Sequence, residues 1–316
     1  MARAPRGSHH GDMDAIQTPP PRGAPAHVLP AGLRLSAVHL VVADLDRSVA
    51  WYGRSLGLLT HRHDPARAEL GDGRETVLVL HEDPQARPAG RHAGLYHVAY
   101  LLPTREELAR AAVRLSATRT PIQGASDHGT HEAIYLADPD GNGIELAADR
   151  PRAAWPEDLG YAGGPAPLAF DDLLATVAGE EPSPRVREGL SVGHLHLHVG
   201  DIDRALVFYR DVLGFELRAH LGTAAFVSAG GYHHHLGINV WQGRGVPGAP
   251  AHTVGLREWA VELPSPTDVM DVRGRIEAAG IAVEPRPGGL LVRDPWGTAL
   301  VVMAAPAGGP SPSAPR

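Results

Sequence analysis

Two stretches of this chain are copies of each other, separated by a constant offset of 157 residues. The match runs without a gap from His39 and His196 to Gly57 and Gly214. Further copies join residues 94–103 to 255–264, and the Asp-Pro turn at Asp138 to the one at Asp294. The chain therefore consists of four similar modules, and its fold has to be assembled from them.

Length and composition leave room for two hydrophobic cores, because 316 residues with 43% apolar content can bury both. The absence of cysteine excludes disulfides and thiolate sites, and it favours an intracellular, cytoplasmic protein. No apolar run has the length of a membrane span or the pattern of a signal peptide. A net charge of -7 without a basic stripe argues against nucleic acid. We therefore expect neither a membrane nor a nucleic acid as partner.

The domain organisation follows from composition and from the repeat. Residues 1–32 and 305–316 are rich in Pro, Gly and Ala, and we expect both ends to be disordered. Between them the sequence predicts one domain at 33–150, a Pro-rich linker at 151–189 with one helix at 170–178, and a second domain at 190–304. Each module is predicted as one strand, one helix and two or three strands, which indicates an α+β fold. Because a single module cannot close a core, modules should pair into curved sheets with a pocket between them.

Local signals place the elements of the first two modules. Asp44 is a good N-cap for a helix at 45–56, and Gly57 ends that helix. Alternating or periodic apolar residues predict the remaining elements: strands at 35–43, 66–70 and 76–81, then a strand at 96–102, a helix at 105–117, and strands at 132–137 and 143–147.

The modules resemble the vicinal oxygen chelate superfamily, which includes glyoxalases, bleomycin-resistance proteins and extradiol dioxygenases. The opening pattern His-Leu-x-Val-x-Asp, followed by Trp/Phe-Tyr and Leu-Gly, is that of the superfamily's module. Residues 124–145, 193–198 and 230–235 are similar to two-domain catechol 2,3-dioxygenases of the bacillus type. The resemblance spans about 33–303 and implies four βαβββ modules paired into two vicinal oxygen chelate domains.

The same resemblance implies a non-haem Fe(II) centre, with Mn(II) as the alternative metal. Such enzymes hold the metal with two histidines and one carboxylate, which leaves positions open for a diol and O2. His97 in the first strand of the second module and Glu145 in its last strand occupy the positions of a family histidine and the family glutamate. A carboxylate on an apolar strand is costly unless a cation or donors meet it, which favours ligands over core residues.

The third ligand is open between two histidines. If modules pair in chain order, His39 completes the set, whereas His196 does so if module two pairs with module three. Both occupy the same repeat position, but the accumulation of histidines in module three favours His196. A hydrogen-bonded pocket, a subunit contact, or a separate site of His196, His235 and Glu258 are the alternatives.

Three residues are candidates for acid–base work beside the metal: His128, Tyr135 and His235. Tyr135 lies ten residues before the carboxylate, where the family places a tyrosine next to the bound diol, and a core tyrosine is the alternative. His128 lies in a polar loop in the region of the family's proton-handling histidine, a residue type suited to that task near neutral pH. His81 would face the pocket under chain-order pairing and His235 under the other. His131 is expected to be exposed.

Taken with the resemblance, these residues predict an extradiol ring-cleaving dioxygenase of aromatic hydrocarbon catabolism. Its partners would be a small aromatic diol and O2, and relatives of this kind imply a homo-oligomer. A glyoxalase-like isomerase or transferase is one alternative, although residues 76–80 lack the second carboxylate it would use. A non-enzymatic binding protein of the bleomycin-resistance kind, without a metal requirement, is the other.

Overall fold

The computed structural model describes residues 27–306. Most of the predicted disordered ends, residues 1–26 and 307–316, lies outside this range. Within the predicted N-terminal arm, Leu29 is buried and its N–H donates to the carbonyl of Gly214 at 2.8 Å. No helix in the described part of the chain is both long and apolar enough to cross a membrane.

Each module folds as one strand, one helix and three strands. Module one comprises β2 (Val38–Val42), α1 (Leu45–Trp51) continued by the π-helical turn η1 (Tyr52–Leu56), β3 (Leu59–Asp64), β4 (Arg67–Gly71) and β5 (Thr76–Glu82). Module two comprises β6 (Gly94–Leu101), α2 (Arg105–Ala117), β7 (Gly124–Asp127), β8 (His131–Ala137) and β9 (Gly143–Asp149). The α+β prediction is therefore confirmed.

The second half of the chain repeats this order. Module three comprises β11 (Ser191–His198), α4 (Ile202–Leu206) continued by η3 (Val207–Val212), β12 (Glu216–His220), β13 (Ala224–Ser228) and β14 (Leu236–Asn239). Module four comprises β15 (Gly255–Leu263), α5 (Pro266–Ala278), β16 (Val283–Arg286), β17 (Gly289–Arg293) and β18 (Ala299–Ala304). Outside the modules lie β1 (Arg34–Leu35) and, in the connection between the halves, η2 (Arg152–Ala154), β10 (Ala166–Pro167) and α3 (Phe170–Ala175).

The caps behave as the sequence predicts. The side chain of Asp44 accepts a hydrogen bond from the N–H of Arg47 at the start of α1. Gly57 ends the following turn with φ 74°, a left-handed conformation that favours glycine. These two residues mark the start and the end of the helical segment between β2 and β3.

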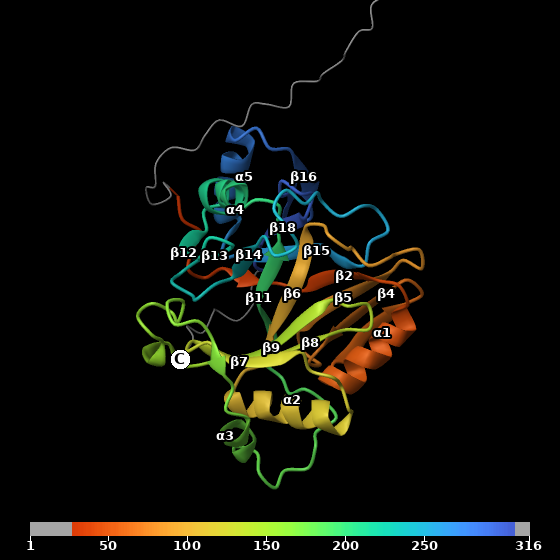
Figure 1. Cartoon of the computed structure of the whole chain (residues 1–316). Coiled ribbons are helices and arrows are strands. Elements are labelled where there is room, and N and C mark those ends of the chain that lie inside the picture. Colours follow the sequence, from red (N-terminus) through yellow and green to blue (C-terminus); the bar gives the residue numbers. More distant parts are fainter. Residues whose placement is uncertain (1–26, 307–316) are drawn as a thin grey trace, which may run out of the picture.

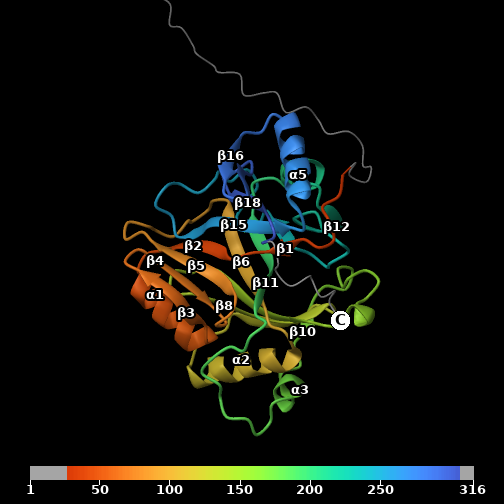
Figure 2. The ribbon, with the colours of Figure 1, turned by 180° about the vertical axis from the view of Figure 1, so that it is seen from behind.

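The strands pair modules from different halves of the chain. β6 runs antiparallel to β11, with His97 opposite His196, and the two strands lie side by side in the centre of the molecule (Figure 1). β2 runs antiparallel to β15, with His39 opposite Glu258. These two strands are seen from behind in Figure 2. Of the two pairings that the sequence left open, the structure has module two with module three. The domain boundaries at 33–150 and 190–304 stay a prediction of where the two halves of the chain begin and end.

Modules of the same half are joined by the repeated tyrosine and the repeated Asp-Pro turn. The Tyr52 hydroxyl donates to Asp138, and the Tyr209 hydroxyl donates to Asp294, each at 3.0 Å. All four residues are buried. A buried carboxylate needs such donors, which explains why both motifs recur together in the sequence.

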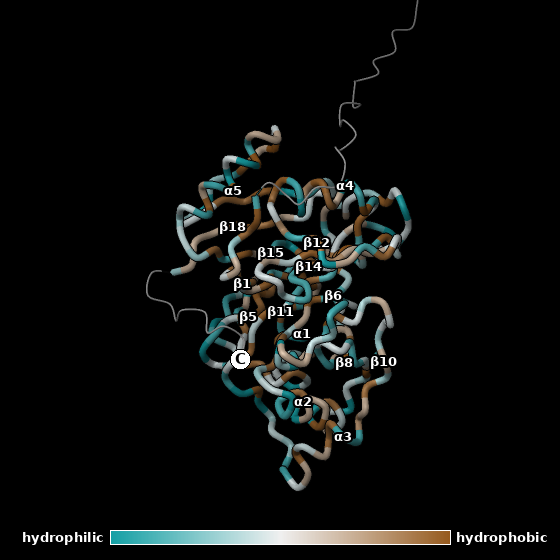
Figure 3. The backbone as a smooth tube through the Cα atoms, turned by 90° about the vertical axis from the view of Figure 1, so that its left-hand side faces the viewer, coloured by the Kyte–Doolittle hydropathy of each residue, from teal (hydrophilic) through white to brown (hydrophobic). Residues whose placement is uncertain are grey.

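One contiguous cluster of buried apolar side chains extends through all four modules. In Figure 3 the hydrophobic stretches follow central strands such as β11 and β18, whereas hydrophilic residues gather on the outlying helices and loops. The molecule thus has two units on one shared core. The β6–β11 unit consists of modules two and three, and the β2–β15 unit consists of modules one and four.

Candidate active site

A row of paired residues crosses β8, β9, β6 and β11. Tyr135 pairs with Glu145, Glu145 with Ala99, and Ala99 with His194. Residues paired across neighbouring strands project from the same face of the sheet. Because Ala99 has only a methyl group, the side chains on either side of it meet, with His194 Nε2 3.1 Å from Glu145 Oε2. The row thus brings together side chains from modules two and three.

His97, Glu145 and His194 form the candidate metal centre, since their ligand atoms all lie within 4.8 Å of one another. His97 Nε2 also lies 3.1 Å from Glu145 Oε2. This nitrogen is buried and has no partner with hydrogen-bond geometry. Its lone pair is therefore available to a metal ion. Two imidazoles and one carboxylate are the donor set of non-haem Fe(II) sites with open positions, so the residues fit the metal.

The charge of this centre is set by Glu145, which is 1% exposed. Burial alone would raise the pKa of Glu145, but the surrounding imidazoles of His194, His131 and His97 hold that pKa well below its usual range. The carboxyl is therefore ionised, which is the form that binds a divalent cation.

His39 lies away from this centre, in the β2–β15 unit. Its Nδ1 is 3.1 Å from His81 Nε2 and 3.5 Å from Glu258 Oε1. This placement corrects the expectation that His39 completes the ligand set, because module one pairs with module four. It also separates Glu258 from the module-three histidines, which removes the alternative site of His196, His235 and Glu258.

His196 lies beside the centre but not in the row of Glu145. Its ring centroid is 5.2 Å from that of His97, and its buried Nε2 has no hydrogen-bond partner. His194, two residues earlier on β11, lies where the sequence left His39 and His196 as alternatives and favoured His196. Strand alternation puts both histidines on one face, so only the pairing of His194 with Ala99 distinguishes them.

A cavity of about 290 Å³ opens over the three ligands. Its walls are largely aromatic and suit a flat ligand held by a few polar groups. The connection between the two halves of the chain supplies one wall, which the sequence gave no reason to expect. The residues from that segment are Leu159, Gly160, Tyr161, Gly164 and Pro165.

His128 and Tyr135 both line this cavity. His128 Nε2 and the Tyr135 hydroxyl are hydrogen-bonded at 2.7 Å. Burial, with the neighbouring His131, lowers the pKa of His128 to about 4. Burial also raises the pKa of Tyr135 above its ordinary value, and the charge of Glu145 adds to this. Near neutral pH the pair is a neutral imidazole beside a protonated phenol, and both lie beside the ligand set.

His235 does not line the cavity, contrary to the expectation for the module two–three pairing. Its Nδ1 accepts the N–H of Ala229 at 3.1 Å. The neighbouring His234 lines the cavity instead. The segment before β14 turns at Gly230 and Gly231, which have φ values of 60° and 70°, so strand alternation does not apply there. His234 is thus a candidate that the sequence pattern missed.

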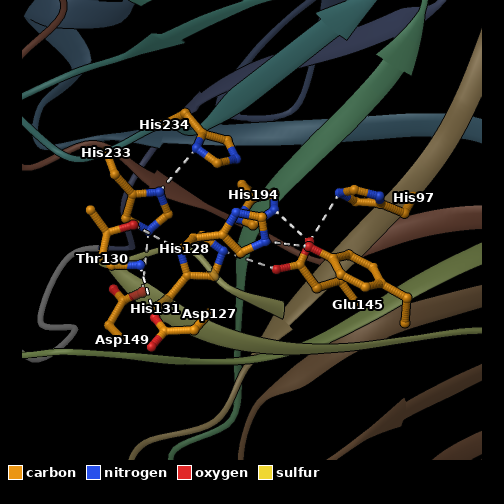
Figure 4. A network of polar contacts seen from close by, with 12 residues as sticks. His97, Asp127, His128, Thr130, His131, Glu145, Asp149, His194, His233 and His234 are labelled. Atoms are coloured by element: carbon orange, nitrogen blue, oxygen red, sulfur yellow. Dashed lines mark hydrogen bonds and ion pairs between the residues drawn. The ribbon is translucent and has the colours of Figure 1, made fainter. Parts of the chain in front are cut away.

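His131 was expected to be exposed and is 3% exposed, so that prediction is wrong. Its Nε2 lies 3.2 Å from Glu145 Oε1, and its ring stacks between those of His128 and His233 (Figure 4). Alternation read backwards from Tyr135 would have found it, because the two residues lie four apart on one strand.

Comparison with known proteins supports a common origin for these modules. The family model described as the Glyoxalase/Bleomycin resistance protein/Dioxygenase superfamily matches residues 34–146 and 191–302. The chain is 40% identical over 269 residues to a catechol-2,3-dioxygenase of Bacillus subtilis, covering 83% of this chain and 94% of that protein. It is 30% identical over 149 residues to biphenyl-2,3-diol 1,2-dioxygenase 2 of Rhodococcus globerulus, covering 44% and 72%.

Solved structures agree with the fold. A putative dioxygenase from Bacillus subtilis matches with a TM-score of 0.60 at 14% identity, covering 88% of this chain and 86% of that one. Glyoxalase I from Zea mays matches with a TM-score of 0.54 at 18% identity, covering 86% and 92%. At such identities the likeness concerns the fold alone.

Proposed function

The chain belongs to the glyoxalase/bleomycin resistance protein/dioxygenase superfamily, and we propose that it is an extradiol dioxygenase that opens a catechol-type aromatic diol with O2 at a non-haem iron centre. One observation carries the proposal. Two imidazoles and one carboxylate converge beneath a cavity, in a chain that is 40% identical to a catechol-2,3-dioxygenase over most of its length.

His97, Glu145 and His194 would hold the metal. Bound there, Fe(II) would supply the open positions at which a diol and O2 meet and would lower the pKa of the diol hydroxyls. All three ligands come from adjoining strands of one sheet, so the cavity side of the centre remains for the substrates. The buried carboxylate gives the site a negative charge that would attract a divalent cation.

The remaining polar residues handle protons and orient the ring. A diol bound over the ligand set lies beside the Tyr135 hydroxyl, which can donate to an oxygen of the substrate. His128 is neutral near pH 7 because burial lowers its pKa to about 4, so its imidazole can accept a proton. The aromatic side chains of Tyr96, Phe226 and Trp241 line the cavity and offer apolar surface against which the ring can pack.

The proposal is tested by purifying the protein under anaerobic conditions, loading it with Fe(II), and following O2 uptake with catechol. We expect one iron per chain and a yellow ring-fission product formed with one O2 per catechol. Bound iron without O2 uptake for any of a panel of substituted catechols would contradict the proposal. A homo-oligomer stays a prediction, which the molar mass in solution checks.

A further inference from the structure

A chain of three side chains lies behind the cavity, beyond the residues assigned above. Asp149, at the end of β9, has Oδ1 3.2 Å from His233 Nε2. His233 Nδ1 lies 3.0 Å from His234 Nδ1 (Figure 4). His233 and His234 are only 1% and 7% exposed, so water does not compete for these contacts. His234, the last member, is the one that lines the cavity.

The hydrogen bonds among Asp149, His233 and His234 fix the position of each proton. A carboxylate only accepts, so His233 must carry its proton on Nε2 to donate to Asp149. A neutral imidazole has one N–H, which leaves Nδ1 of His233 as an acceptor. His234 must then donate from its own Nδ1. Its Nε2 is left with a free lone pair, on the side of the ring away from His233 (Figure 4).

Tyr161, from the connection between the two halves, fits the same arrangement. Its hydroxyl donates to the carbonyl oxygen of His233 at 3.0 Å. That donation uses its single proton, so its oxygen can only accept from His234 Nδ1, 3.3 Å away. The N–H on Nδ1 of His234 thus faces two acceptors, His233 Nδ1 and the Tyr161 hydroxyl oxygen.

We propose that Asp149 and His233 are positioning residues that hold His234 in the tautomer with its lone pair on Nε2, directed into the cavity. The ring of His234 lies 4.2 Å from that of the ligand His194, so this lone pair is next to the metal centre. In that position it accepts the proton of a substrate hydroxyl: the O–H bond breaks, an N–H bond forms on Nε2, and no electrons are exchanged with an oxidant. The role in turnover rests on the proposed function, whereas the tautomer does not.

The same residues are less suited to a second metal ion. His131, Asp149 and His233 have ligand atoms within 4.8 Å of one another. Both ring nitrogens of His131 are already engaged, however, because Nε2 lies 3.2 Å from Glu145 Oε1 and Nδ1 lies 2.9 Å from Thr130 Oγ1. Asp149 is also engaged at both oxygens, because Oδ2 accepts the Tyr232 hydroxyl at 2.8 Å. The geometry is that of a hydrogen-bonded chain.

The tautomer is tested by ¹⁵N NMR of histidine-labelled, metal-free protein. The signals of His234 are identified as those missing from His234→Gln. We expect a protonated Nδ1 and an unprotonated Nε2 in the wild type, and loss of this single tautomer in Asp149→Asn, whose amide can donate to His233. A wild-type His234 with its proton on Nε2 overturns the proposal. This measurement needs no turnover, and the wild-type spectrum decides even if Asp149→Asn does not fold.

The role in turnover is tested with the iron-loaded protein. Loss of an outer hydrogen-bond partner typically costs about 10- to 100-fold in activity, and we expect Asp149→Asn to lower kcat in that range with KM for catechol and iron content unchanged. Asp83→Asn is the matched control, because Asp83 accepts from His252 at 2.8 Å in an exposed pair outside the site, and its kcat should stay at the wild-type value. An unchanged kcat in Asp149→Asn refutes the role. If the wild type cleaves no catechol, the proposed function fails and the NMR result still stands.

Discussion

The β6–β11 unit and the β2–β15 unit are built alike and differ in the side chains that meet at their centres. The register identifies the corresponding positions: Glu258 pairs with His39 as His97 pairs with His196, and Val301 pairs with Ala260 as Glu145 pairs with Ala99. The residue 157 positions before His194 is Ala37. The three proposed ligands therefore correspond to a glutamate, a valine and an alanine.

What remains in the β2–β15 unit is a polar cluster of His39, His81 and Glu258. The side chains of His39 and Glu258 are 24% and 23% exposed, whereas Glu145 is 1% exposed. The polar atoms of a partly hydrated cluster can form hydrogen bonds with water and ion pairs with neighbouring charges. A buried carboxylate has no access to water and needs a cation or donors beside it. The same backbone thus carries the proposed metal centre in one unit and a partly exposed polar cluster in the other, and three side chains make the difference.

The largest expected effect is the loss of the metal from Glu145→Gln, compared with Glu258→Gln in the other unit. The amide keeps the shape of the side chain but removes the charge that a divalent cation requires. We expect Glu145→Gln to lose bound iron. Catechol cleavage should fall by more than the ~100-fold that follows the loss of a residue hydrogen-bonded to a metal ligand. Glu258→Gln should keep both. Iron analysis and an O2 electrode measure the outcome. A Glu145→Gln protein with full iron content would show that the metal does not bind in this unit.

The next comparison concerns His194 and His196, which project from the same face of β11. His194→Ala should abolish iron binding, because its Nε2 lies 3.1 Å from Glu145 Oε2. His196→Ala should retain iron and lower activity by about 10- to 100-fold as the loss of a neighbouring group. The check is iron stoichiometry after dialysis. The reverse pattern would mean that the ligand is His196 and that the row through Ala99 does not define the centre.

The fold was largely predictable from the sequence because its determinants are local. The cap at Asp44 and the apolar periodicity of 105–117 are set within single elements, and the structure has both. The pairing of modules was left open, since four similar modules offer more than one partner for each strand. Only the packed structure decides between them.

The site was predictable where one module supplies it. His97, Glu145, Tyr135 and His128 all belong to module two, and the structure brings these four together. His194 was missed because the repeat aligns His39 with His196. The register between two strands that are distant in the sequence also cannot be predicted from the residues of either strand alone. Tyr161 was missed for another reason: the connection that carries it has no periodicity from which a position could be read.

A smaller effect is expected for the hydroxyl of Tyr135, whose counterpart in the other unit is Leu291. Tyr135→Phe removes the hydrogen bond to His128 without changing the ligand set. We expect unchanged iron content and a kcat lower by about 10-fold. This is the lower limit of the loss that usually follows when a hydrogen-bonding residue around a metal site is removed. Leu291→Met, a swap of similar volume in a core position, should leave kcat unchanged. Steady-state kinetics with catechol separate the two, and equal kcat values for Tyr135→Phe and wild type would remove the hydroxyl from the mechanism.

The smallest effect belongs to the β2–β15 unit and concerns stability at acidic pH. Burial, with the positive charges of Arg67 and Arg257, lowers the pKa of His39 from 6.5 to about 4. Between these values the unfolded chain binds a proton that the folded chain does not, so stability is present above pH 6.5 and is lost as the pH falls toward 4. Allowing for the partial exposure of the ring, we expect this loss to be roughly 1–2 kcal/mol.

Urea unfolding of the metal-free protein at pH 7.5 and pH 4.5 measures this difference, and His39→Gln should lose less stability between the two conditions than wild type. The adjacent His81, whose pKa is likewise lowered to about 4 by burial, contributes to the same loss of stability in wild type and in His39→Gln. His39→Gln should bind iron as wild type does, since its position lies in the other unit. A variant with the wild-type pH dependence would mean that the cluster is hydrated enough to accept protons freely, and the contrast between the two units would then rest on metal binding alone.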